Sequence, residues 1–291
     1  MTTPTLLQKT RYTFELVKFS HTLFALPFAL SSFFIATRGN FSKVLILWVM
    51  LCVLFARSAA MAFNRLVDAR WDALNPRTKN RHIPQGVLNK SYVVTLTIVS
   101  AAAFLFCSAQ INRLTLLLAP LCLGVLFFYS FAKRFTHYSQ FILGFCLGMA
   151  PVGAAIAATG RIDTGSLWLG TAVLFWVAGF DLLYALQDLE FDRHQGLHSF
   201  AVKLGIRRSF RVSALLHAFF LAGLAGYGFW ENLGKIYWCG LGISAGLLLY
   251  QHAVLKEDLR KIQTAFFTAN GLLSFFFLLF VLLEVYWGFS N

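Results

Sequence analysis

The chain has 291 residues, of which 58% are hydrophobic and only 13% are charged, and its mean hydropathy is +0.67. Because a soluble domain carries roughly 25% charged residues, this composition excludes an ordinary soluble protein and indicates a polytopic membrane protein. The five cysteines all lie in apolar stretches and form no C-x-x-C pair. Their placement argues against a disulfide framework or a cysteine zinc site and predicts buried free thiols.

A polar segment over residues 1–18 comes first, and we expect it to form a short surface helix. Nine apolar stretches come after it, most of them near the roughly 20 residues that a helix needs to cross a bilayer. They cover residues 19–37, 44–63, 91–109, 114–131, 138–158, 166–187, 211–230, 236–254 and 265–287. The first is too long and starts too late for a cleaved signal peptide. The sequence therefore predicts an all-α fold of nine transmembrane helices in one membrane-embedded domain over residues 1–291.

The formal net charge of +13 is distributed as in a membrane protein with a defined orientation. Most of the 25 lysines and arginines fall in the N-terminal tail and in the loops after even-numbered spans. The opposite side carries only Arg38, Lys43, Arg113, Arg161 and Lys235. Basic loops face the anionic cytoplasmic leaflet, so we expect a cytoplasmic N-terminus and an outer C-terminus. This pattern argues against nucleic acid as a partner.

A polar stripe occupies the end of the second span. In a helix, residues three, four, seven, eleven and fifteen positions apart share a face, which groups Arg57, Met61, Asn64, Asp68 and Asp72. Two carboxylates and an amide oxygen on one face, near the membrane surface, are hard oxygen donors of the kind that Mg²⁺ prefers. The stripe therefore predicts a magnesium site.

The loop after this stripe is unusually basic. Pro76 should end the helix near Asn75, because the residue before a proline disfavours α geometry. The loop then carries more positive charge than topology requires, which favours a phosphate-binding loop over a plain cytoplasmic connector. Its basic and imidazole side chains are Arg77, Lys79, Arg81 and His82.

A second acidic cluster ends the sixth span, with Asp181, Tyr184, Asp188 and Asp192 at spacings of three and four. On a continuous helix Asp181 lies deepest, and the other two aspartates come after it on the cytoplasmic side. Two carboxylate clusters, each ending an even-numbered helix on the same predicted side, suggest two pseudo-related halves around a central cavity, with the motifs at 64–72 and 181–192.

Paired carboxylate helices suit the binding of a diphosphate through a divalent metal. An allylic diphosphate leaves when Mg²⁺ and cationic side chains take up its developing charge. Lys133 and Arg134 close the fourth span, where they either contact that diphosphate or extend to the interface as topology residues. Arg57 lies about three turns deeper than Asp68, where it either meets an acceptor carboxylate or pairs with an intramembrane acid.

A protein of another class remains open on this evidence, an ion-coupled secondary transporter, whose intramembrane acids would lie near the bilayer midplane. The predicted place of these aspartates, at inner helix ends beside basic loops, favours the enzyme. A purely structural membrane scaffold leaves the doubled acidic cluster unexplained.

The run N-R-L-V-D-A-R-W-D over residues 64–72, continued by N-P-R-T and R-H-I-P-Q-G, resembles the first aspartate motif, N-x-x-x-D-x-x-x-D, of the UbiA family of intramembrane prenyltransferases. The run from Asp181 to Gly196 resembles the family's second motif, and Y-x-x-x-K-R over residues 129–134 is similar to its inner-loop signature. The resemblance covers nearly the whole chain.

The resemblance implies helices around a central cavity that opens toward lipid. It also implies Mg²⁺-dependent transfer of a polyprenyl group from a polyprenyl diphosphate to the ring of a hydroxyaromatic carboxylic acid, beside its hydroxyl. The implied metal ligands, of which the aspartates are the catalytic residues, are Asn64, Asp68, Asp72, Asp188 and Asp192. The implied substrate contacts come from Asn64 and from Arg57, Arg77, Arg81, Lys133, Arg134, Asp181 and Tyr184.

One departure from the family pattern is Arg65, which stands where many members have an aspartate and so removes one possible metal ligand. The branch that the motif resembles includes enzymes that use 4-hydroxybenzoate for ubiquinone and enzymes that use a dihydroxynaphthoate for menaquinone. Both acceptors stay open. We expect an integral protein of a bacterial inner membrane, with the active site facing the cytoplasm.

Overall fold

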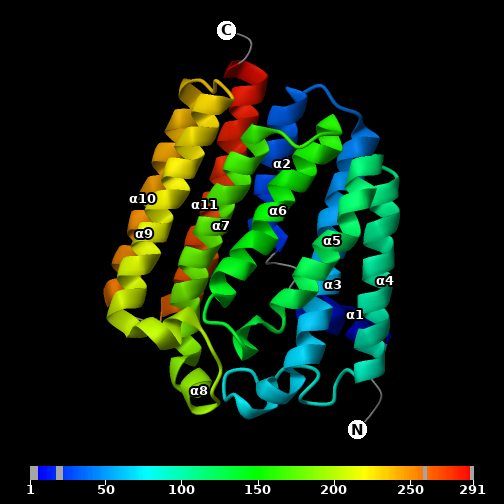
Figure 1. Cartoon of the computed structure of the whole chain (residues 1–291), viewed down its shortest axis with the longest axis vertical. Helices are drawn as coiled ribbons and strands as arrows, with labels where there is room; N and C mark the ends of the chain where they lie inside the picture. Colours follow the sequence, from blue (N-terminus) through cyan, green and yellow to red (C-terminus); the bar gives the residue numbers. More distant parts are fainter. Residues whose placement is uncertain (1–5, 18–21, 258–260, 289–291) are drawn as a thin grey trace. The chain divides into compact units, whose positions relative to one another are not determined.

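The computed structural model describes residues 6–17, 22–257 and 261–288, and every regular element in that part of the chain is helical (Figure 1). The α-helices are α1 Leu6–Leu16, α2 Thr22–Thr37, α3 Lys43–Leu74, α4 Lys90–Ala109, α5 Arg113–Tyr129, α6 Ser139–Thr159, α7 Thr164–Tyr184, α8 Leu189–His194, α9 Phe200–Trp230, α10 Lys235–Glu257 and α11 Ile262–Leu283. The predicted all-helical class is therefore correct for the described residues.

Seven helices of the described residues are long and apolar enough to cross a membrane. Two further apolar helices are shorter, over Phe24–Thr37 and Arg113–Tyr129. The chain is accordingly an integral membrane protein, whereas the count of nine transmembrane helices and the cytoplasmic N-terminus stay predictions. The first predicted span, over 19–37, begins at residues that lie outside the described part of the chain.

The seventh predicted span starts too late. Its helix, α9, begins at Phe200 rather than at residue 211, because Ser199 caps it by accepting a hydrogen bond from Val202 N at 3.2 Å. Sequence hydropathy misses this first part because it is polar and basic. Gly205 interrupts it with a φ of 70°, a left-handed conformation that glycine adopts without steric cost.

The chain divides into two compact units, each of which carries one of the predicted aspartate motifs. The first unit comprises Met1–Thr22 and Leu47–Phe131, and the second comprises Leu23–Ile46 and Ala132–Asn291. A single domain over the whole chain stays a prediction.

In the first unit, α1 packs against the chain around the basic loop. Leu16 and Val17 share a small apolar cluster with Ala62, Leu88 and Val93. Polar contacts fix the same junction: Thr13 Oγ1 lies 2.8 Å from Tyr92 Oη, and Glu15 Oε2 lies 3.1 Å from His82 Nε2. The N-terminal helix thus holds the loop that comes after α3.

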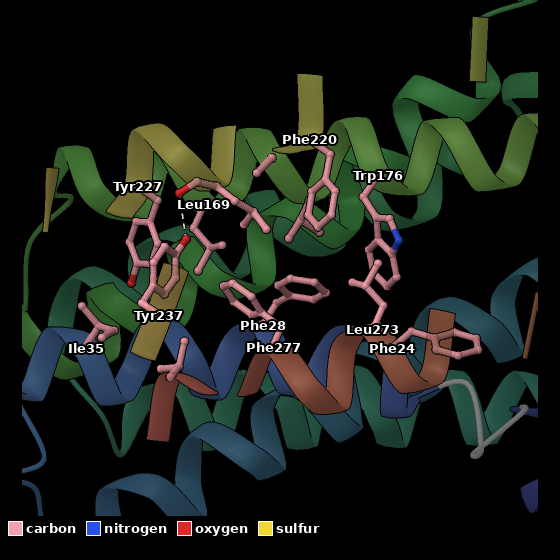
Figure 2. Packing of buried hydrophobic residues seen from close by; sticks show 14 of the residues in the cluster. Phe24, Phe28, Ile35, Leu169, Trp176, Phe220, Tyr227, Tyr237, Leu273 and Phe277 are labelled. Carbon is pink, nitrogen blue, oxygen red and sulfur yellow. Dashed lines mark hydrogen bonds between the residues drawn. The ribbon is translucent and has the colours of Figure 1, made fainter. Parts of the chain in front are cut away.

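In the second unit, α7 packs along both α6 and α9, and α10 packs along α11 (Figure 1). Aromatic rings fill the core between them (Figure 2). The ring of Phe28 lies 4.9 Å from that of Trp176 and 5.0 Å from that of Phe277, centroid to centroid. Tyr237 satisfies its buried hydroxyl by donating to Leu224 O at 2.7 Å. This packing holds α7, the helix that leads into the second aspartate motif.

The five cysteines are free thiols. Cys107 and Cys146 are buried as predicted, and Cys52 and Cys122 are half-buried. The prediction is wrong for Cys239, which is exposed on α10. An apolar residue of a membrane protein can face lipid as well as the protein core, so hydropathy alone does not distinguish the two.

Small residues bring α6 and α7 close together. A methyl group added at Gly144 would collide with the backbone carbonyl of Leu174, and one at Gly148 would collide with that of Gly170. Gly153, on the same helix, is exposed and has open space around it. Small residues in a membrane helix either permit close helix approach or leave room for a ligand, and at Gly144 and Gly148 the first holds.

We therefore expect Gly144→Ala to destabilise the protein by about 1–3 kcal/mol, because two backbones must separate to admit the methyl group. The matched substitution Gly153→Ala should be neutral or stabilising by about 0.5–1 kcal/mol, since alanine favours the helix. Thermal unfolding of both variants in detergent measures the difference. Equal stabilities would contradict the close approach of α6 and α7.

Candidate active site

The first aspartate motif lies at the C-terminal end of α3, which ends at Leu74 as the proline predicted. Asp72 is buried with 6% of its surface exposed, while Asp68 and Asn64 are half-buried. Asn64 Nδ2 donates to Ser130 Oγ at 3.5 Å. The donor end of this amide is thus occupied, which makes its oxygen the atom suited to a cation.

The basic loop folds back on the end of α3. Arg81 Nη1 lies 2.6 Å from Asp72 Oδ1, and Thr78 Oγ1 donates to Asp72 O at 3.2 Å. Asn75 shapes the turn by accepting from Arg77 N at 2.9 Å. The structure therefore brings Arg81 together with the motif, but onto an aspartate instead of an open phosphate site. Arg77 is half-buried, and its predicted phosphate contact stays a prediction.

Arg65 removes a possible metal ligand from the first motif, and it also adds a positive charge there. Its side chain is buried with 8% exposure, and Asp68 and Asp72 come three and seven residues later on the same face of α3. A buried guanidinium needs such compensation. Arg65 therefore partly neutralises the first acidic cluster. Its position inside an aspartate motif was the only sequence signal of this role.

Arg57 lies seven residues before Asn64 on α3, about 10 Å deeper along the helix axis. Within the part of the chain that the structure describes, it forms no ion pair, and its buried Nε has no hydrogen-bond partner. The alternative of an internal pair with an intramembrane acid is therefore not realised there. A half-buried guanidinium without a partner in an apolar segment is costly, which favours a role in binding an anionic group.

The second motif differs from its predicted geometry. The helical segment Thr164–His194 is not a uniform α-helix: α7 ends at Tyr184, a 3₁₀ turn covers Ala185–Asp188, and α8 begins at Leu189. A 3₁₀ turn advances about 120° per residue instead of about 100°, so four residues rotate the next helix by about 80°. The carboxylates therefore do not lie on the single straight stripe that the spacings of three and four predict.

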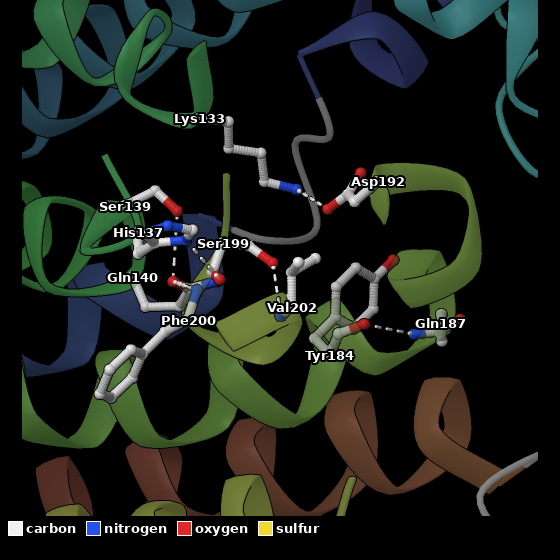
Figure 3. A network of polar contacts seen from close by, with 10 residues as sticks. All are labelled: Lys133, His137, Ser139, Gln140, Tyr184, Gln187, Asp192, Ser199, Phe200 and Val202. Carbon is white, nitrogen blue, oxygen red and sulfur yellow. Dashed lines mark hydrogen bonds and ion pairs between the residues drawn. The ribbon is translucent and has the colours of Figure 1, made fainter. Parts of the chain in front are cut away.

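The negative charges of three carboxylates in this motif nevertheless stabilise the protonated form of one cation, Lys133. Lys133 Nζ lies 3.3 Å from Asp192 Oδ2 (Figure 3). Burial lowers the pKa of Lys133, but the charges of Asp192, Asp181 and Asp188 outweigh it and raise that pKa above the ordinary value. Lys133 therefore stays charged at neutral pH. Asp188 and Asp192 are themselves buried, with 6% and 3% exposure.

The segment that carries Lys133 is fixed to the start of α9 (Figure 3). Lys133 O accepts from His198 N at 2.7 Å, and Gln140 Oε1 accepts from Phe200 N at 3.2 Å. These contacts hold the ammonium beside Asp192, so Lys133 is more than a topology residue. Arg134 is exposed, and the predicted substrate roles of Arg134 and Tyr184 stay predictions.

The donor set suits magnesium. Among the described residues, no three histidine, cysteine or acidic side chains are grouped closely enough to hold a metal alone. Mg²⁺ is usually bound through one or two carboxylates together with substrate phosphates and water, so a complete protein cage is not required. In each motif, a buried aspartate beside a cation fits that requirement as a hard oxygen donor, and the first motif adds the Asn64 amide oxygen on α3.

Comparison with known proteins relates the chain to one family of prenyltransferases. Residues 25–282 match the model of the UbiA prenyltransferase family. The chain is 33% identical over 215 residues to a 4-hydroxybenzoate octaprenyltransferase of Nitrosospira multiformis, covering 74% of this chain and 73% of that one. It is 29% identical over 250 residues to the enzyme of the same name from Vibrio atlanticus, covering 86% and 88%.

Solved structures share the fold. The apo structure of a UbiA homologue from Aeropyrum pernix superposes with a TM-score of 0.83 at 29% identity, over 91% of this chain and 98% of that one. A UbiA homologue from Archaeoglobus fulgidus bound to DMAPP and Mg²⁺ gives a TM-score of 0.73 at 20% identity, over 94% and 98%. At that identity the second likeness concerns the fold alone.

Proposed function

Because the chain belongs to the UbiA prenyltransferase family, and is thus a membrane prenyltransferase, we propose that it moves a polyprenyl group from a polyprenyl diphosphate to 4-hydroxybenzoate in quinone biosynthesis. In this reaction the bond between the prenyl carbon and the diphosphate oxygen breaks, a carbon–carbon bond forms beside the ring hydroxyl, and the ring loses a proton. The relatives named 4-hydroxybenzoate octaprenyltransferase support this acceptor.

The observation that carries the proposal is the pairing of a buried aspartate with a cation in each motif, Asp72 with Arg81 and Asp192 with Lys133. We assign Asp68, Asp72, Asp188 and Asp192, with Asn64, to holding the metal. When bound, Mg²⁺ supplies Lewis-acid stabilisation of the departing diphosphate.

The chain's own cations complete the charge balance. In the proposed reaction, Lys133 and Arg81 exchange their aspartate for a phosphate oxygen or keep that aspartate oriented, which their ion pairs with Asp192 and Asp72 support. Arg77 and Arg134 add positive charge for the diphosphate. Asp181 and Tyr184 contact the substrate. Arg57 binds the carboxylate of the acceptor. Apolar walls would exclude water from the allylic cation.

The position of the acids argues against a secondary transporter. Asp188 and Asp192 belong to the last turns of the helical segment Thr164–His194, and Asp72 belongs to the last turn of α3. A transport site lies near the midplane of the bilayer instead. With the basic loops on the anionic leaflet, we propose a bacterial inner-membrane enzyme with its active site toward the cytoplasm.

Acceptor choice is tested by offering 4-hydroxybenzoate and a dihydroxynaphthoate separately to the purified protein with Mg²⁺ and a polyprenyl diphosphate. We expect kcat/KM to be at least about tenfold higher with 4-hydroxybenzoate, the range that one or two pocket contacts supply. A preference for the dihydroxynaphthoate would transfer the protein to menaquinone synthesis while leaving prenyl transfer intact. No product from either acceptor would contradict the proposed function itself.

A further inference from the structure

A second polar site lies at the other end of α7 from the aspartate motif. A cavity of about 290 Å³ opens there between the ends of α2, α6, α7 and α9, all within the second unit. Its charged lining consists of Arg38, Arg161, Asp163 and Glu231. Asp163 precedes the first turn of α7, whereas Asp188 and Asp192 lie beyond its last turn. The cavity is therefore separate from the second aspartate motif.

Two of the four charges are paired with each other. Arg38 Nη2 lies 3.2 Å from Glu231 Oε2 and donates to Glu231 O at 3.3 Å. Burial raises the pKa of Glu231 above its ordinary value. The charge of Arg38 opposes this rise, and the charge of Asp163 adds to it. Arg38 holds an unusual left-handed backbone with a φ of 50° at the end of α2. This pair forms one fixed wall of the cavity.

The other two charges are not satisfied by the described residues. Asp163 Oδ1 caps α7 by accepting from Ser166 N at 2.9 Å, but the buried Oδ2 has no donor among those residues. Arg161 is exposed, and the structure gives its guanidinium no acceptor within the same part of the chain. An unsatisfied buried carboxylate oxygen is unfavourable, so an occupant should bring a hydrogen-bond donor to it. It should also bring an anion to Arg161.

We propose that this cavity binds the headgroup of a membrane lipid that carries both a phosphate and a primary ammonium, as in phosphatidylethanolamine. The lining holds two cations and two anions, which fits a zwitterion better than an anion. A primary ammonium donates N–H hydrogen bonds to Asp163 Oδ2, whereas a trimethylammonium has none to give. The phosphate is placed toward Arg161.

The place and size of the cavity support a lipid as the source. It lies where apolar helices end, which is where we expect the headgroups of a surrounding bilayer, and the exposed ring of Trp230 borders it as interfacial tryptophans do. Its volume of about 290 Å³ is at the lower limit for ligand pockets, which span about 300–1,000 Å³. It therefore suits a headgroup rather than a prenyl chain.

The experiment is native mass spectrometry of the purified full-length protein, titrated with phosphatidylethanolamine, phosphatidylcholine and phosphatidylglycerol that share the same acyl chains. We expect the ethanolamine lipid to bind about tenfold more tightly than the other two, the gain from one charge-assisted hydrogen bond. Equal affinity for the three lipids would overturn the proposal. Prenyl transfer is measured in parallel and should not depend on substitutions in this cavity.

Asp163→Asn is the sharpest variant, because asparagine caps a helix as well as aspartate does but lacks the negative charge. Its affinity for phosphatidylethanolamine should fall about tenfold, to that for phosphatidylcholine, with unchanged thermal stability. Arg161→Gln should weaken the binding of phosphatidylethanolamine and of phosphatidylcholine. Lys235→Gln removes another exposed cation at this end of the unit, outside the cavity, and should change nothing. A full preference for phosphatidylethanolamine in Asp163→Asn would contradict the site.

The soluble compound glycerophosphoethanolamine carries the same headgroup without acyl chains and tests the source of the ligand. We expect it to bind far more weakly than the lipid, because it lacks the attachment that the bilayer provides. Binding as tight as that of the lipid would assign the cavity to a soluble zwitterion and would overturn the lipid assignment.

Discussion

Asp68→Asn and Asp188→Asn should each lower prenyl transfer by at least about a hundredfold, while the protein still folds and inserts into the membrane. Asparagine keeps the shape of the side chain but removes the negative charge that a magnesium diphosphate needs. Transfer from a radiolabelled polyprenyl diphosphate to 4-hydroxybenzoate, in membranes with saturating Mg²⁺, measures the effect.

Glu190→Gln provides the matched control for this pair. Glu190 lies two residues after Asp188, but its carboxylate is exposed and faces Arg193 at 3.6 Å. This variant should keep wild-type activity. Full activity in both aspartate variants would contradict the metal role, and equal losses in all three variants would point to general damage of the helix end.

Arg57→Met should lower kcat/KM for 4-hydroxybenzoate by roughly 100- to 1,000-fold, the loss expected when one partner of a buried charge pair is removed. The same variant should process an uncharged acceptor, such as 4-hydroxybenzamide, about as well as the wild type does. The reason is that Arg57 has no internal partner among the described residues, so its charge is available to a ligand.

Arg70→Met is the control, because Arg70 lies on the same helix but is exposed, 5.7 Å from the ring centroid of Trp71. It should lose little activity with either acceptor. If Arg57→Met lowered the rate equally for the charged and the uncharged acceptor, binding of the acceptor carboxylate by Arg57 would be ruled out.

Much of the helical framework could be predicted from local signals. Apolar runs located the long helices, and Pro76 fixed the end of α3 to within one residue. Charged residues at helix ends identified the two aspartate motifs, because acids are rare in apolar segments unless they have a function.

Features that depend on packing could not be predicted in this way. The 3₁₀ turn at Ala185–Asp188 has no proline or glycine to announce it, and it changes the angular positions of the carboxylates around it. The contacts of Asp72 with Arg81 and of Asp192 with Lys133 depend on how connecting segments fold back. The same holds for the partly buried contact between His217 Nδ1 and His252 Nε2, at 2.8 Å across α9 and α10.

The charged cavity between the ends of α2, α6, α7 and α9 shows the same limit. Arg38, Arg161, Asp163 and Glu231 come from separate helix ends, and each reads in the sequence as an ordinary interfacial residue. Only the arrangement of α2, α6, α7 and α9 within the second unit places them around one cavity. Their juxtaposition is a tertiary property, which spacing along the chain does not encode.

The most direct test of the proposed mechanism is an experimental structure of the protein with Mg²⁺ and a non-hydrolysable polyprenyl diphosphate analogue. We predict one diphosphate, bridged by magnesium to carboxylates of both motifs, with Asp68 from one and Asp188 from the other among the ligands. A diphosphate bound by a single motif, with the other facing a separate chamber, would contradict the mechanism.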